Sequence, residues 1–375
     1  SAVGEILPRD ELPQAITAMS IAYNGARALG PALAGLVFGL ASSLGGAGMG
    51  GGAVFTLALS GILVLAWDFH RRPPRPHPPT RLPPERLWGG TLAGLRYAWH
   101  AETILAQLVR TAAYSAAGSA LWALLPVIGQ QRLGLGAAGF GGLMACLGTG
   151  AVAAGLTIGP LRQRLGLERL VAVCCVIFAA VMAVAALSRW ALPVYLALVA
   201  GGGAWMAVMN TFNTATQTSA PPWVRSRATA MHVLSALGPF ALGSALWGMV
   251  AGLLGLQAAL VLAAALMLAN LLLARHFPLR MGALHEVTPA PFKDLLVADE
   301  PDPEAGPVAV ELSYRIDPAQ AEAFLALAIQ LKGPRHRDGA TFWRIYRDLD
   351  DAGRFVERFI VTSWADYLHQ RARQT

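Results

Sequence analysis

Long apolar stretches separated by short polar connections dominate the first 280 residues. A helix needs about 20 apolar residues to cross the hydrocarbon core of a bilayer. Eight stretches come near that length: 15–41, 52–68, 104–130, 138–159, 168–187, 192–217, 227–252 and 255–276. The pattern therefore predicts eight membrane-crossing helices.

The composition supports a membrane protein. Hydrophobic residues make up 55% of the chain and charged residues 14%, whereas soluble domains average about 25% charged residues. These values exclude an ordinary soluble enzyme and a disordered chain. The net charge of +7 comes from arginines between the apolar stretches, which is how membrane proteins place cations, so we expect no nucleic-acid partner.

The arginines also predict the orientation. They gather in every second connection and in the stretch after the last apolar run: Arg9, Arg71, Arg72, Arg75, Arg81, Arg86, Arg96, Arg162, Arg164, Arg169, Arg225, Arg227, Arg275 and Arg280. The opposite connections contain Arg132 and Arg189. By the positive-inside rule the arginine-rich side is cytoplasmic, and eight crossings put both chain ends there.

The connection 70–86 contains seven prolines and five arginines, which excludes a regular helix or strand. It divides the chain into 1–69, with two apolar stretches, and 104–276, with six. Residues 87–103 read as an amphipathic helix at the cytoplasmic membrane surface, so 70–103 is expected to be linker plus surface helix.

The pattern changes after a linker at 277–305. Residues 308–316 alternate as a strand does, and 318–331 form an amphipathic helix opened by Asp317 as N-cap and Pro318 at its first position. Residues 341–347 and 354–364 alternate again around a turn at 350–353, and a second helix starts at 365. The order within 306–375 is most of a ferredoxin-like α+β unit, with its closing strand missing.

A short internal repeat lies in the apolar region. Ala28-Leu29-Gly30-Pro31 recurs as Ala236-Leu237-Gly238-Pro239, and each copy is followed by a further glycine, Gly35 or Gly243. Gly-Pro within a membrane helix removes a backbone hydrogen bond and permits close helix packing. Internal repeats are typical of transporter folds, although chance recurrence in so Ala- and Leu-rich a chain stays open.

These features resemble the major facilitator superfamily. The stretch from Leu12 to Gly35 is similar to the fifth helix of that fold and its preceding loop, 159–166 to the basic loop after the eighth helix, and 222–228 to the loop before the eleventh. The resemblance implies an all-α polytopic membrane bundle, of which helices 5–12 are present, followed by the small α+β domain. It is nearest to the enterobactin-exporter-like branch. On this interpretation we expect a chain lacking helices 1–4 that does not transport by itself.

The resemblance implies a secondary active transporter of a bacterial inner membrane, exporting small amphipathic molecules, drugs or siderophores by alternating access. Protons are a candidate coupling ion. No cofactor is expected. Cys146, Cys174 and Cys175 lie in apolar runs and have no metal-ligand spacing, so we read them as core residues.

Polar residues inside apolar stretches are the candidates for a substrate cavity or for coupling, because such groups are costly in hydrocarbon. They are Asn24, Arg27, Arg110, Tyr114, Trp122, Asn210, Asn213, Gln217 and His232. Each has an alternative role. Arg27 would pair with a carboxylate, Arg110 would reach the headgroups, and His232 would serve as a helix-end or gate histidine. The amides of 210–217 would bond between helices, and Tyr114 and Trp122 would be packing residues.

The C-terminal unit resembles the dimeric α+β barrel family of antibiotic-biosynthesis monooxygenases. Its possible roles are a regulatory or dimerising appendage, or the catalytic part of a membrane-anchored oxygenase. His336, Trp343, Trp364 and His369 are the residues to weigh for the second role, yet they show no metal spacing, nucleophile–base pair or phosphate loop. The polar faces of the helices exceed what an anchor needs, which favours the transporter.

Overall fold

The computed structural model describes residues 60–61, 63–64, 67, 87–282 and 301–373. Within them, six helices are long and apolar enough to cross a membrane. They are α5 (Glu102–Val127, continued by the π-helix η1, Ile128–Arg132), α6 (Ala137–Leu165), α7 (Leu167–Leu187), α8 (Ala191–Ser219), α9 (Arg225–Leu254) and α10 (Leu256–Ala269, continued by the 3-10 helix η2, Asn270–Arg275). These six match the last six predicted stretches. Stretch 15–41 and nearly all of 52–68 lie outside the described residues.

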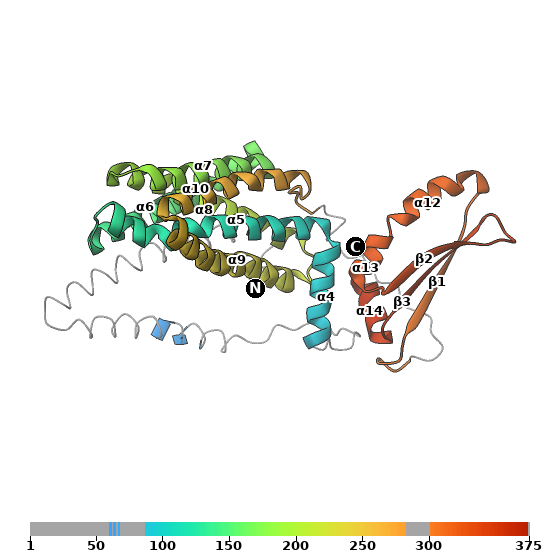
Figure 1. Ribbon diagram of the computed structural model, residues 1–375. Coiled ribbons are helices and arrows are strands. Elements are labelled where there is room, and N and C mark those ends of the chain that lie inside the picture. Colours follow the sequence, from blue (N-terminus) through green and yellow to red (C-terminus); the bar gives the residue numbers. More distant parts are fainter. Residues whose placement is uncertain (1–59, 62, 65–66, 68–86, 283–300, 374–375) are drawn as a thin grey trace.

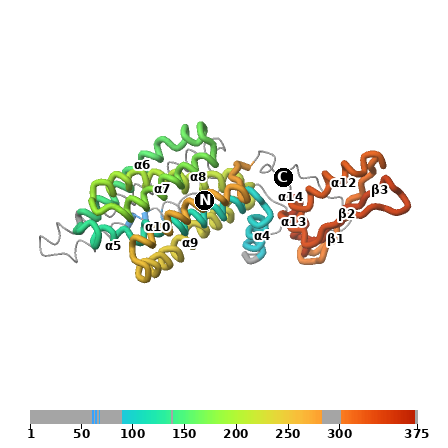
Figure 2. The backbone as a smooth tube through the Cα atoms, turned by 45° about the horizontal axis from the view of Figure 1, so that its top comes forward, coloured from blue at the N-terminus to red at the C-terminus, as the bar shows by residue number. Residues whose placement is uncertain are grey.

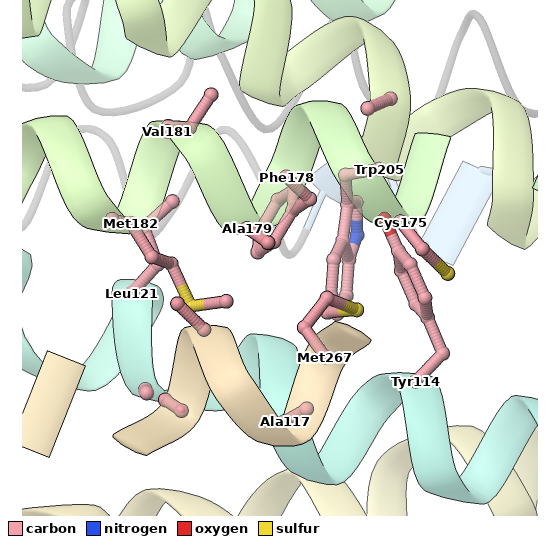
Figure 3. Packing of buried hydrophobic residues seen from close by; sticks show 14 of the residues in the cluster. Tyr114, Ala117, Leu121, Cys175, Phe178, Ala179, Val181, Met182, Trp205 and Met267 are labelled. Atoms are coloured by element: carbon pink, nitrogen blue, oxygen red, sulfur yellow. The ribbon is translucent and has the colours of Figure 1, made fainter. Parts of the chain in front are cut away.

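The six helices form one bundle whose members pair out of chain order (Figure 1). α5 packs along α9, α6 along α8, and α7 between α8 and α10. The core contains side chains of all six helices, with Trp205 of α8 near its centre. The Trp205 ring lies 5.5 Å from the Tyr114 ring of α5 and 5.6 Å from the Phe178 ring of α7 (Figure 3). Aromatic stacking thus joins the three inner helices.

Glycines set the closest helix crossings. A Cβ on Gly150 would meet the carbonyl of Val199, and one on Gly202 would meet the carbonyl of Leu147, so α6 and α8 touch through their backbones. A Cβ on Gly243 would lie 2.8 Å from the carbonyl oxygen of Ala116, where α9 crosses α5. Small residues allow this approach in membrane bundles.

One expected loop is helical. The segment 159–166, predicted as the basic loop after a membrane helix, continues α6 to Leu165 despite Pro160. The turn consists of Gly166, whose φ of 74° allows it to end α6 and begin α7. The helix can extend past the hydrocarbon because its last turn carries Arg162 and Arg164.

Helix α4 (Leu87–His100) crosses the end of the bundle at a steep angle to the membrane helices (Figures 1 and 2). Ala93, Tyr97 and Ala98 are buried, whereas Leu95 and Trp99 are 57% and 70% exposed. The predicted amphipathic helix over 87–103 is therefore present, and it ends three residues early. The bundle end that it crosses is called the α4 end below.

The C-terminal unit contains a three-stranded antiparallel sheet in the order β1-β3-β2. Its strands are β1 (Val308–Arg315), β2 (Phe342–Arg347) and β3 (Arg354–Val361), and α14 (Trp364–Arg373) follows them. The predicted helix 318–331 is instead divided into η3 (Pro318–Gln320) and α12 (Ala321–Ile329), and an additional helix, α13 (Lys332–Asp338), follows it. Asp317 caps η3 as expected, accepting from the Ala319 amide at 3.0 Å. Pro334 lies in the first turn of α13, a position that tolerates proline, so the chain begins a new helix there.

The C-terminal unit contacts the rest of the protein through α13 and α4 (Figure 1). The rings of His100 and His336 stack with centroids 5.9 Å apart, and the Arg337 guanidinium lies 5.4 Å from the centroid of the Tyr97 ring. On its other side α4 touches α9, where a Cβ on Gly94 would lie 3.1 Å from the Arg227 side chain. Helix α4 therefore lies between the bundle and the small domain.

Candidate functional site

Buried polar side chains concentrate on α5, α8 and α9. We call this group the polar seam: Gln107, Arg110, Thr111, Ser115, Ser119, Asn210, Thr211, Thr214, Thr216, Gln217, Ser219 and His232. In the described parts of α6, α7 and α10, by contrast, the one comparably buried polar side chain is Asn270, in the η2 continuation of α10. Polar groups in a membrane bundle are placed where they bind each other, water or a ligand.

Arg110 is buried in the bundle and does not reach for the headgroups. Its side chain is 2% exposed, and Nη1 lies 3.2 Å from Oε2 of Glu168 at the start of α7. The same nitrogen donates to the carbonyl of Phe277 at 3.3 Å. Glu168 was not among the sequence candidates, because a carboxylate at the end of an apolar stretch reads as an interfacial residue.

Tyr114 and Trp122 lie in the aromatic core around Trp205. Tyr114 is 1% exposed and packs on Phe178 as well as Trp205, and Trp122 meets Trp205 with ring centroids 5.8 Å apart. Sequence reasoning missed Trp205. A tryptophan after three consecutive glycines in an apolar helix was the available signal.

The amides of α8 bond within their own helix. Nε2 of Gln217 donates to Oδ1 of Asn213 at 2.9 Å, and the hydroxyl of Thr214 donates to Oδ1 of Asn210 at 3.5 Å. Asn210 and Gln217 are buried and Asn213 is half-buried. The predicted common face at positions i, i+3 and i+7 therefore exists, with part of its hydrogen bonding satisfied locally.

His232 joins α9 to α5. It is 5% exposed, and its Nδ1 lies 3.5 Å from the hydroxyl of Thr111. That hydroxyl also donates to the carbonyl of Gln107 at 2.7 Å. The histidine lies two turns from the start of α9, at the α4 end.

Three buried hydroxyls of the polar seam and the adjoining aromatic core have no hydrogen-bond partner among the residues that the structure describes. They are Tyr114 Oη and Ser115 Oγ on α5 and Thr211 Oγ1 on α8. Leaving a buried polar group unbonded costs about 1–3 kcal/mol. Orphaned groups of this kind are the places where a polar ligand or water would be stabilised.

The second copy of the Gly-Pro motif divides between two roles. Gly243 is a close-packing position, and Trp247 one turn later donates its Nε1 proton to the same Ala116 carbonyl at 2.8 Å. A Cβ on Gly238 would meet Leu234 of its own helix at 3.9 Å, so Gly238 and Pro239 form no tight crossing with described residues. Asn24, Arg27, Gly30, Pro31 and Gly35 lie outside the described residues.

In the C-terminal unit the central polar residue is Glu357, which the sequence did not single out. It is fully buried on β3 and accepts from Arg335 Nε at 2.8 Å, Trp343 Nε1 at 2.9 Å and Tyr314 Oη at 2.7 Å. Burial alone would raise the pKa of Glu357, but these donors outweigh it and lower the pKa. Burial and the hydrogen bond to Glu357 raise the pKa of Tyr314 to about 12.

The other candidates of this unit do not form a catalytic arrangement. Nδ1 of His336 contacts the Ala340 carbonyl at 2.8 Å, and Trp364 packs on Tyr367. His369 is buried in α14. No group of three metal-binding side chains occurs among the described residues.

A bundle of six membrane-length helices with a buried polar seam defines a multi-pass membrane protein of the transporter class. Residues 1–375 match the protein family described as "Transmembrane secretion effector", so the chain belongs to that family. The membership identifies a secondary transporter of the major facilitator type and points away from an enzyme. No curated protein matches the chain.

Proposed function

We propose that the protein exports small amphipathic molecules across a bacterial inner membrane by alternating access, with siderophores and drugs as candidate substrates and protons as the candidate coupling ion. The observation that carries the proposal is the set of three buried hydroxyls without a partner among the described residues, Tyr114 Oη, Ser115 Oγ and Thr211 Oγ1, together with the aromatic core around Trp205. Aromatic side chains bind the apolar part of such a ligand, and hydroxyls bind its polar part.

Orientation is part of the proposal. The α4 end and the C-terminal unit are cytoplasmic, because the arginines gather on that side. Reporter fusions in 42–51 and 131–137 should give periplasmic signals. A cytoplasmic signal from either would overturn this orientation.

The membrane-anchored oxygenase is the weaker alternative. An anchor does not require orphaned hydroxyls in its bundle core, whereas the buried carboxylate of the C-terminal unit is already bound by three donors. We propose instead that this unit regulates the transporter or joins two copies of it.

The test uses substitutions that remove orphaned hydroxyls while keeping shape. Tyr114→Phe and Thr211→Val in the full chain should leave thermal stability equal or higher, since an unbonded buried group is lost. If the hydroxyls bind substrate, dye efflux from cells or energised vesicles that carry the chain together with helices 1–4 of the fold should fall about tenfold, equivalent to one lost hydrogen bond.

Thr149→Val is the matched control. The Thr149 hydroxyl is exposed on α6 and donates to the Ala145 carbonyl at 2.8 Å, so its loss should leave efflux unchanged. If both seam variants export as the wild type does, the hydroxyls are packing defects and the proposed binding region is wrong.

A further inference from the structure

The segment that follows η2 runs across the α4 end without regular secondary structure. We call residues 277–282 the strap. The Phe277 amide still donates to the Leu273 carbonyl of η2, but four other backbone polar groups of the strap bind side chains of the membrane helices. The Phe277 carbonyl accepts from Arg110 at 3.3 Å, and the Leu279 amide donates to Glu168.

Two further bonds fix the other half of the strap. The Arg280 carbonyl accepts from Nε2 of Gln107 at 3.2 Å, and the Gly282 amide donates to the hydroxyl of Ser219 at 2.8 Å. Gln107 belongs to α5 and Ser219 ends α8. The strap thus bonds to α5, α7 and α8, and its partners come from residues 107 to 219 of the chain.

Packing supports these bonds. Leu279 is 8% exposed and belongs to the main hydrophobic core. A Cβ on Gly282 would lie 2.9 Å from the Cα of Ser219, so the strap lies directly on the end of α8. A chain that merely left the membrane would stay hydrated and would need neither a buried leucine nor four side-chain partners.

Arg110 and Glu168 do more than neutralise each other. The arginine has one partner on α7 and one on the strap, and the glutamate has one on α5 and one on the strap. Because each member holds a backbone group of the strap, neither could be exchanged with the other and keep the same bonds. The positions of the arginine and the glutamate are therefore not interchangeable.

We propose that Gln107, Arg110, Glu168 and Ser219 are positioning residues that clamp the strap across α5, α7 and α8, so that these helices move as one body during transport. The clamp is a property of the fold. Its consequence for transport rests on the proposed function. Alternating access needs a half that rocks without splaying at its ends.

Hydrogen exchange of the full chain in lipid nanodiscs tests the clamp itself. In Glu168→Gln the amide of Leu279 should exchange about tenfold faster, because a neutral amide oxygen is a weaker acceptor than a carboxylate. In Ser219→Ala the amide of Gly282 should do the same while Leu279 stays protected.

Glu102→Gln is the matched control. Glu102 lies 3.9 Å from Arg280 of the strap but is 92% exposed, so this variant removes the same charge near the same segment without removing a bond to its backbone. Strap exchange should stay within about twofold of wild type. Unchanged exchange in both Glu168→Gln and Ser219→Ala would overturn the clamp. So would acceleration in Glu102→Gln equal to that in Glu168→Gln.

A double exchange of the pair separates a clamp from a simple ion pair. If Arg110 and Glu168 only neutralise each other, Arg110→Glu combined with Glu168→Arg restores wild-type strap exchange. If they clamp the strap, the double variant stays as fast as Glu168→Gln, because an arginine at 168 cannot accept from the Leu279 amide. Restored protection would overturn the proposal.

Efflux kinetics test the consequence for transport. Ser219→Ala should lower the maximal rate and leave KM within about twofold, since it touches no proposed substrate group. A raised KM at constant maximal rate would refute the positioning role. Failure of the proposed function is seen separately, in the response to Tyr114→Phe and Thr211→Val, while the exchange results do not depend on what is transported.

Discussion

The bundle and the C-terminal unit each contain a buried arginine–glutamate pair, and the two pairs differ in what else they bind. In the bundle the arginine side chain is 2% exposed and the glutamate 36%, and both bind the backbone of the strap. In the C-terminal unit the glutamate is completely buried and the arginine is 14% exposed, and the other donors are the side chains of Tyr314 and Trp343.

The difference shows how one kind of ion pair serves two purposes. When the remaining hydrogen bonds of an ion pair go to the backbone of a separate segment, the pair fixes where that segment lies. When the remaining hydrogen bonds go to side chains of the same sheet, the pair stabilises the interior of a single unit. Breaking the second should unfold a domain, whereas breaking the first should release a segment.

The largest effect is expected from Glu357→Gln. Removing one charge of a buried pair leaves the other charge uncompensated, which costs about 3–5 kcal/mol of folding free energy. Pulse proteolysis of the full chain should show this loss in the C-terminal unit with the bundle intact. Glu311→Gln is the control, because its pair with Arg358 is exposed and 3.3 Å long, so its loss should cost less than about 1 kcal/mol. Equal losses of stability in Glu357→Gln and Glu311→Gln would contradict the difference between a buried and an exposed ion pair.

Acid should affect the C-terminal unit through the same carboxylate. The pKa of Glu357 is lower folded than its unfolded value of about 4.3, so its contribution is complete above that value and is lost as pH falls through the folded pKa. Exchange protection of β3 should therefore decline below about pH 4, more steeply in wild type than in Glu357→Gln. Identical pH profiles in the two proteins would argue against a shifted Glu357.

The crossing of α5 and α9 tests stabilisation by close packing instead of by an ion pair. Gly243→Ala introduces a methyl group against Ala116 and Ser119 and should cost about 1–3 kcal/mol by overpacking. Thermal unfolding in detergent should show the loss. Gly248→Ala on the same helix meets nothing within 4 Å and should be neutral or slightly stabilising. A neutral Gly243→Ala would mean that α9 can shift away from α5.

The smallest effect concerns the contact between the two regions. His100→Ala removes one ring of the stack with His336 and should weaken the docking of α13 by about 0.5–1.5 kcal/mol. Faster exchange in α13 without change in β3 is the expected signature. Leu95→Ala, exposed on the same α4, should leave α13 unchanged.

The spacing of apolar residues and the positions of turn residues were enough to predict the six described membrane helices, helix α4 and the three strands to within a few residues. Helix α13 was missed, because Gly333 and Pro334 directly after 318–331 favour a helix end over the start of a new helix. The continuation of α6 through Pro160 was also missed, since proline argues for a boundary and tertiary context overrode it.

The sequence singled out several residues that the structure buries, but it did not identify their partners. Arg110 and His232 stood out as polar residues in apolar stretches, a signal local to each helix. Glu168 and the strap did not, because their importance depends on which helix ends meet. That pairing follows from three-dimensional packing of non-neighbouring helices, on which hydropathy carries no information.

The out-of-order pairing of the helices has a consequence for how the protein is made. Arg110 enters the membrane 58 residues before Glu168 is synthesised, and α5 precedes its main partner α9 by a longer stretch still. At ribosomal speeds of about 5–20 residues per second, about 3–12 s pass between the synthesis of Arg110 and that of its counter-ion Glu168. During that interval the insertion machinery, a lipid phosphate or water must shelter the charge, so α5 is the segment whose integration should depend most on the elongation rate.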